Sequence, residues 1–156
     1  MNWQQVCENP DLQNLPYKIE LNRQGQIIMS PASVKHVLYQ ARIIKLLNQS
    51  EDERIAVPEF PIETHEGVKV ADVALLTPEQ VSAVENYVSS AMAPLVCIEV
   101  LSPSNTQIEM NHKKQLYFEK GAEEFWLCDQ NGDISFYDKG GQLTASQLVL
   151  EFPSKL

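Results

Sequence analysis

PLVCIEVLSP, residues 94–103, is an apolar run that is bounded by prolines and interrupted by a single carboxylate, Glu99. A run this short and this rich in β-branched residues is typical of a strand that is buried on both faces. Alternation along the strand places Cys97, Glu99 and Leu101 on one face, and Val96, Ile98 and Val100 on the other. An unpaired charge in such a row would cost several kcal/mol, so Glu99 is expected to have a partner.

A second stretch repeats this pattern upstream. VKVADVALL, residues 68–76, also reads as a buried strand and has Asp72 as its only acid. Two buried strands with one acid each suggest a shared polar site, and a divalent cation such as Mg²⁺ or Mn²⁺ would neutralise it.

The chain as a whole is expected to fold as one domain, residues 1–156, without a membrane span. Its length of 156 residues suits a single hydrophobic core. No apolar run is long enough to cross a bilayer and residues 1–5 do not resemble a secretion signal, so we expect a cytoplasmic protein. Of the three cysteines, Cys97 and Cys128 fall in expected core strands and are interpreted as reduced packing residues. The net charge of −9 argues against tight non-specific binding to nucleic acid.

The order of patterns predicts an α/β or α+β fold, with a mixed sheet and helices on its faces. The clearest helix is residues 34–48, with Ser33 as its N-cap. Residues 54–64 contain two prolines, so they can form only an interrupted or edge strand. The other expected elements are a helix in 3–13, a hairpin of 17–21 with 26–29, a helix from Pro78, a helix over 105–120 that ends at Gly121, strands at 124–129 and 133–137, and a final strand at 146–152.

Lys113 completes a candidate catalytic site. A helix from about residue 105 that folds back over its strand carries Lys113 roughly level with Glu99, at ~1.5 Å per helical residue and ~3.3 Å per strand residue. Lys113 also shares a helix face with Leu116 and Tyr117, which should face the sheet. Two buried carboxylates with an inward lysine suit metal-assisted phosphodiester hydrolysis, in which the lysine orients water or stabilises charge on the phosphate.

The same residues carry a resemblance to a known family. Four motifs in order resemble the Uma2 family (DUF820) of endonucleases, which is abundant in cyanobacteria and belongs to the PD-(D/E)xK superfamily. The motifs are Tyr17-x-x-Glu20 with Met29-Ser30-Pro31, Ala71-Asp72-Val73-Ala74, Ile98-Glu99-Val100-Leu101-Ser102-Pro103-Ser104, and Lys113-x-x-Leu116-Tyr117 followed by Gly121-Ala122-x-Glu124-Phe125-Trp126-Leu127. The resemblance implies a restriction endonuclease-like fold, with Asp72 and Glu99 as metal ligands. It also implies that the Val100 carbonyl and Glu20 contribute to the metal site and that Lys113 is the catalytic lysine.

The sequence departs from the superfamily pattern at two positions. Ala71 precedes Asp72 where the superfamily has proline, and Leu101 stands where the superfamily has its lysine. The resemblance implies that the lysine has moved to the following helix. The choice of Lys113 over the adjacent Lys114 depends on helical phase alone.

Several alternatives remain open for these residues. Asp72 and Glu99 could form a structural cluster with Lys113 or Arg42 and hold no metal. Glu20 could face solvent from its hairpin strand, and His36 is expected to be a surface or packing residue.

The leading hypothesis is a Mg²⁺- or Mn²⁺-dependent DNA endonuclease. The alternative is a catalytically inactive protein of the same fold that acts as a protein- or nucleic-acid-interaction module. A basic rim around the Asp72–Glu99 site would favour the nuclease, and an acidic or apolar rim would favour the module. A homodimer would present two sites to the two strands of a duplex.

Overall fold

A six-stranded mixed sheet forms the centre of the protein. The computed structural model describes residues 1–156. The strand order is β3-β4-β5-β6-β7-β8, in which β5 and β6 are parallel and all other neighbours are antiparallel. The strands are β3 (Ile55–Thr64), β4 (Gly67–Leu76), β5 (Val96–Val100), β6 (Glu124–Cys128), β7 (Ile134–Asp138) and β8 (Gly141–Leu143). The two predicted strands that carry Asp72 and Glu99, β4 and β5, are therefore neighbours.

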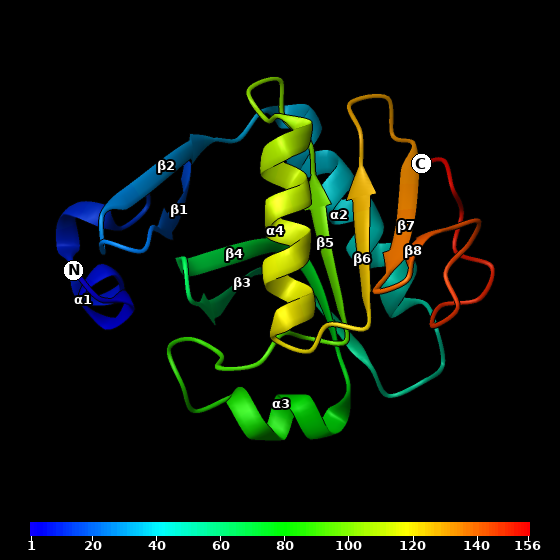
Figure 1. Cartoon of the computed structure of the whole chain (residues 1–156), viewed down its shortest axis with the longest axis horizontal. Helices are drawn as coiled ribbons and strands as arrows, with labels where there is room; N and C mark the ends of the chain where they lie inside the picture. Colours follow the sequence, from blue (N-terminus) through cyan, green and yellow to red (C-terminus); the bar gives the residue numbers. More distant parts are fainter.

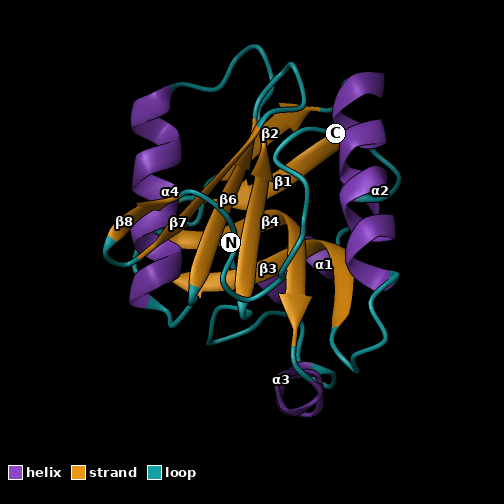
Figure 2. Ribbon diagram, turned by 90° about the vertical axis from the view of Figure 1, so that its right-hand side faces the viewer, coloured by secondary structure: helices purple, strands orange, loops and turns teal.

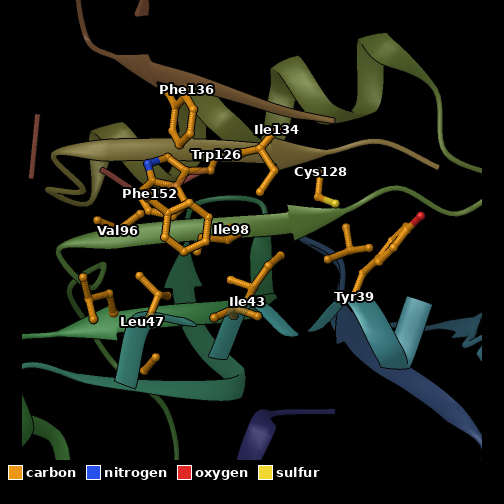
Figure 3. Packing of buried hydrophobic residues seen from close by; sticks show 14 residues of the cluster. Tyr39, Ile43, Leu47, Val96, Ile98, Trp126, Cys128, Ile134, Phe136 and Phe152 are labelled. Atoms are coloured by element: carbon orange, nitrogen blue, oxygen red, sulfur yellow. The ribbon is translucent and has the colours of Figure 1, made fainter. Parts of the chain in front are cut away.

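Helices cover both faces of this sheet. Helix α4 (Gln107–Glu119) lies on one face and α2 (Val34–Asn48) on the other (Figures 1 and 2). The alternation predicted for β5 is confirmed, because its two faces enter two different core clusters. On the α2 side, Ile43 and Leu47 pack with Ile98 and Trp126 (Figure 3). On the α4 side, Met110 and Tyr117 pack with Cys97, Phe125 and Leu127. The expected α/β fold with a flanked mixed sheet is confirmed.

The N-terminal part of the chain lies beside the sheet rather than in it. Strands β1 (Tyr17–Leu21) and β2 (Ile27–Pro31) form a separate two-stranded antiparallel sheet (Figure 1). The helix α1 (Trp3–Glu8) and a 3₁₀ turn, Pro10–Leu12, precede it. A small apolar cluster containing Val6, Leu21 and Val68 joins this part to β4. The hairpin is thus held where β1 faces β4 and β5, the strands that carry Asp72 and Glu99.

Local sequence signals explain where the helices begin and end. The Ser33 side chain accepts a hydrogen bond from the His36 N–H and caps α2, as expected. Thr77 caps the short helix α3 (Pro78–Val84), which has Pro78 at its first position. Helix α4 begins two residues later than predicted, because Thr106 forms a capping box with Glu109. Gly121 ends it with a φ of 103°, a conformation that favours glycine.

Two further predictions on the sheet can be compared with the structure. β3 is an edge strand, and this confirms the interpretation of its two prolines. The final strand predicted at 146–152 is wrong: the last strand is β8, and 146–152 has no strand structure. The segment instead turns over the buried carboxylate of Glu124, which accepts hydrogen bonds from the Ser146 hydroxyl and from the N–H groups of Gln147 and Leu148. Backbone groups bound to a side chain are not available for a sheet.

Two smaller expectations concern the cysteines and the membrane. Cys97 and Cys128 are buried and free, as predicted, and Cys7 is exposed. Among the helices, none combines the length and the apolar character that a bilayer crossing requires.

Candidate functional site

A pocket of about 450 Å³ opens where the β1–β2 hairpin, helix α2 and helix α4 meet the centre of the sheet. Every residue that the sequence singled out as a site residue lines it: Glu20, Asp72, Glu99, Val100 and Lys113. Residues more than 90 positions apart in the chain therefore meet in one hollow.

Asp72 and Glu99 come together because β4 and β5 are paired. The antiparallel register places Val73 opposite Ile98, so Asp72 and Glu99 follow as the next two positions across from each other. Both are almost fully buried, at 1% and 2% exposure. The Val100 N–H donates to Asp72 Oδ2 at 2.8 Å and fixes this carboxylate against β5. The prediction that the two acids share one polar site is confirmed by this geometry.

Lys18 is the residue that sequence reasoning missed. Its Nζ lies 2.9 Å from Asp72 Oδ1 and 3.1 Å from Glu99 Oε2, so one ammonium group joins the two carboxylates. A signal for it exists in the sequence, because Lys18 and Glu20 alternate onto the same face of the hairpin strand. Arg42, considered as a partner of the acids, lies instead over the ring of Tyr39.

Lys113 reaches the site from the inner face of α4. Its Nζ lies 3.5 Å from Glu99 Oε1, and 2.9 Å from Glu20 Oε1. The neighbouring Lys114 turns outward and lies over the ring of Tyr137. Helical phase therefore selected the lysine that points into the pocket. One turn further along α4, the Tyr117 hydroxyl donates to Glu99 Oε1 at 2.7 Å.

Glu20 is buried, contrary to the alternative in which it faces solvent. It is 6% exposed, and both of its oxygens accept hydrogen bonds. Oε1 accepts from Lys113 and Oε2 accepts from the Val70 N–H at 2.7 Å. It thus joins the hairpin to α4 and β4, while its role as a metal ligand stays a prediction.

His36 also lines the pocket and contacts Asp72, a contact that the expected surface or packing role did not include. Its Nε2 lies 3.4 Å from Asp72 Oδ1, and its Nδ1 is buried without a hydrogen-bond partner. One turn along α2, Gln40 donates to the Asp72 carbonyl oxygen at 2.6 Å and to Glu59 at 2.7 Å. The first turns of α2 therefore hold Asp72 from the side opposite α4. Packing of α2 against β4 brings these residues to Asp72, and local sequence patterns do not report such packing.

The charges of this cluster shift one another's protonation. Burial opposes ionisation of Asp72, but Lys18 and His36 outweigh it and hold its pKa well below the usual range. For Lys18, burial is likewise outweighed by Asp72, Glu99 and Glu20, which raise its pKa. For Glu99 burial dominates: together with repulsion from Asp72 and Glu20, it raises the pKa to about 7 against the attraction of the two lysines. The three carboxylates have only two ammonium partners, those of Lys18 and Lys113. Glu99 is the carboxylate whose ionisation this shortage of positive charge disfavours.

The donor set fits a small hard cation. Two carboxylate oxygens from adjacent strands already meet one cationic nitrogen, that of Lys18. No three His, Cys, Asp or Glu side chains converge as a metal cluster. Mg²⁺ nevertheless is commonly bound by one or two carboxylates, with water and substrate phosphate completing its shell. Asp72 and Glu99 would hold such an ion, and Val100 lines the same pocket.

The fold and site together define a restriction endonuclease-like protein, with strand acids and a helix lysine at one side of a flanked mixed sheet. The Uma2 family model, described as "Putative restriction endonuclease", matches residues 3–156. The chain therefore belongs to the Uma2 family.

Comparison with solved structures supports the fold. A crystal structure described as a putative nuclease belonging to DUF820, from Anabaena variabilis ATCC 29413, superposes with a TM-score of 0.70. The two chains are 18% identical, and the match covers 99% of this chain and 90% of the other. No curated protein matches the sequence significantly.

Proposed function

We propose that the protein is a divalent-metal-dependent endonuclease that hydrolyses phosphodiester bonds in DNA. The observation that carries the proposal is that Asp72 Oδ1 and Glu99 Oε2 both contact one cationic group, the Lys18 ammonium, with Lys113 beside them. The family, whose description is "Putative restriction endonuclease", supports the reaction class.

Each residue has a distinct role in this proposal. Asp72 and Glu99 are the metal ligands, with the Val100 carbonyl and Glu20 as further candidate ligands. A divalent ion held there would activate water for attack and offset charge on the scissile phosphate. Lys113, held by Glu20, would orient the attacking water or stabilise charge on the phosphate. Tyr117 fixes Glu99, and the Val100 N–H fixes Asp72, so the two ligands need little reorganisation.

The charge of the pocket is compatible with a cation site. Its lining carries five carboxylates against two lysines: the acids are Glu20, Glu59, Asp72, Glu99 and Glu109. Such a surplus repels bare phosphate and attracts a divalent cation. Binding of DNA here would therefore depend on the ion, and weak binding in its absence is expected.

The test combines calorimetry with plasmid nicking, for the wild type and for Asp72→Asn. The wild type should bind Mg²⁺ or Mn²⁺ and nick supercoiled DNA only when the ion is present. Asp72→Asn keeps the size of the side chain and should lose both properties, while the exposed Asp11→Asn should retain them. Equal behaviour of wild type and Asp72→Asn would reject the proposal.

The acidic lining also favours the second candidate, a catalytically inactive interaction module of the same fold. In that case Lys18 and Lys113 would serve as permanent partners of the buried acids. Glu99→Gln should then stabilise the protein without affecting any activity, because it removes a buried charge. In the nuclease, the same substitution should abolish nicking.

A further inference from the structure

The Lys18 ammonium group lies between the two predicted metal ligands, Asp72 and Glu99. Its Nζ contacts Oδ1 of Asp72 and Oε2 of Glu99, one oxygen from each carboxylate. Lys113 does not do this, since its ammonium group contacts Glu99 and Glu20. Of the two lysines that line the pocket, only Lys18 links the two predicted metal ligands.

We infer that Lys18 is a built-in counter-cation of the metal site, which a divalent ion must displace in order to bind. This inference rests on the metal site of the proposed function but not on hydrolysis. The assignment makes Lys18 a positioning residue: it keeps Asp72 and Glu99 close together in the metal-free protein and sets the ion concentration at which the site fills.

The charges support exchange rather than joint occupancy. When Glu99 is ionised, it carries three negative charges together with Asp72 and Glu20, and Lys18 and Lys113 supply two positive charges. Replacement of the Lys18 ammonium by a divalent ion brings this cluster to neutrality. If the Lys18 ammonium stayed beside the divalent ion, two cations would lie close together between the same oxygens, and they would repel each other strongly in this buried setting.

The position of Lys18 allows it to leave. It belongs to β1 of the two-stranded hairpin, not to the central sheet, and its side chain is 11% exposed in the pocket. A lysine ammonium on a four-carbon stem can turn toward the pocket mouth by rotamer changes, without movement of the strand. Asp72 remains fixed by the Val100 N–H, and Glu99 by Tyr117, so the ligands stay in place when Lys18 moves.

The first arm of the test is calorimetric titration of the full chain with MnCl₂. Lys18→Met removes the charge and keeps most of the side-chain volume, while Lys139→Met is the control in an exposed turn. Mn²⁺ should bind Lys18→Met at least about tenfold more tightly than it binds the wild type or Lys139→Met. Binding to Lys18→Met that is no tighter than to the wild type, including the absence of binding to both, would overturn the inference.

The second arm uses only wild-type protein and remains decisive if Lys18→Met does not fold. Acetylation by an activated ester is followed by peptide mass spectrometry, in EDTA and in saturating MnCl₂. Lys18 should be protected in EDTA and become several-fold more reactive with Mn²⁺, while Lys139 is unchanged. Unchanged or lower reactivity of Lys18 would overturn the inference.

The outcomes separate this inference from the proposed function. Tighter Mn²⁺ binding by Lys18→Met without any DNA cleavage by the wild type would support the inference and contradict the nuclease. Equal Mn²⁺ affinity of the two proteins, with metal-dependent cleavage retained, would contradict the inference and support the nuclease.

Discussion

Lys113 lies closer to Glu20 than to Glu99: its Nζ is 2.9 Å from Glu20 Oε1 and 3.5 Å from Glu99 Oε1. The helix lysine is thus anchored to an acid of the N-terminal hairpin, 93 positions away in sequence. The hairpin is therefore part of the site, and Glu20 positions the lysine on which the proposed reaction depends.

The first prediction separates the two adjacent lysines of α4. Lys113→Met should lower metal-dependent nicking by at least about 100-fold, because it removes the only α4 cation in the pocket. Lys114→Met should change nicking little, since Lys114 packs on the ring of Tyr137. The measurement is the single-turnover rate of plasmid nicking. A larger loss in Lys114→Met than in Lys113→Met would contradict the site.

The second prediction concerns the hydrogen bond between Tyr117 and Glu99. Tyr117→Phe removes a buried donor at 2.7 Å from Glu99 Oε1 and should cost about 1–3 kcal/mol of unfolding free energy. Urea denaturation in EDTA measures this cost. The control is Tyr137→Phe, because the contacts of Tyr137 with Lys114 and Phe125 are made by its ring and remain in the variant. Equal stability of the two variants would show that the Tyr117 hydroxyl contributes little.

The third prediction is a pH dependence of stability in the metal-free protein. The pKa of Glu99 is raised from 4.5 to about 7, so between these values the folded state binds more protons than the unfolded chain. The unfolding free energy should therefore fall as pH rises from 5 to 8, by on the order of 1–3 kcal/mol. The hydrogen bond from His36 to Asp72 raises the pKa of His36, which adds a loss in the same direction above pH 6.5.

Denaturation in EDTA at several pH values measures this slope. Glu99→Gln cannot titrate, so its stability should change less over the same range, while the exposed Glu51→Gln should behave as the wild type. A wild-type stability that rises steadily from pH 5 to 8 would contradict the raised pKa of Glu99.

The fourth prediction tests the anchor of the C-terminal segment. Glu124 is 2% exposed and accepts hydrogen bonds from Trp126 Nε1 and from residues 146–148. Glu124→Gln places an amide among these donors and should cost about 2–4 kcal/mol of unfolding free energy. Hydrogen exchange should increase in residues 146–152. The neighbouring exposed Glu123→Gln should have no such effect, and protection that is equal in both variants would disprove the anchor.

The sequence predicted the elements well where the signals are local. The alternation of β5, the cap at Ser33 and the phase of Lys113 all follow from periods and caps within one element. The errors arise where distant segments meet. Residues 146–152 alternate like a strand, but the buried carboxylate of Glu124 takes up their backbone N–H groups.

The site was predicted in part for the same reason. Asp72 and Glu99 are visible as charges in apolar runs, and their pairing follows from the neighbouring strands. Lys18 shares a strand face with Glu20, but neither Lys18 nor His36 interrupts an apolar run, so no local pattern identifies them as partners of Asp72. Their positions depend on how the hairpin and α2 pack against β4.

The most direct test of the account is anomalous diffraction from crystals soaked in MnCl₂. We expect a manganese peak at the Asp72 and Glu99 carboxylates, with the Lys18 ammonium turned away from them. No peak at saturating Mn²⁺, with Lys18 Nζ still bound to both carboxylates, would contradict the metal site and the function proposed from it.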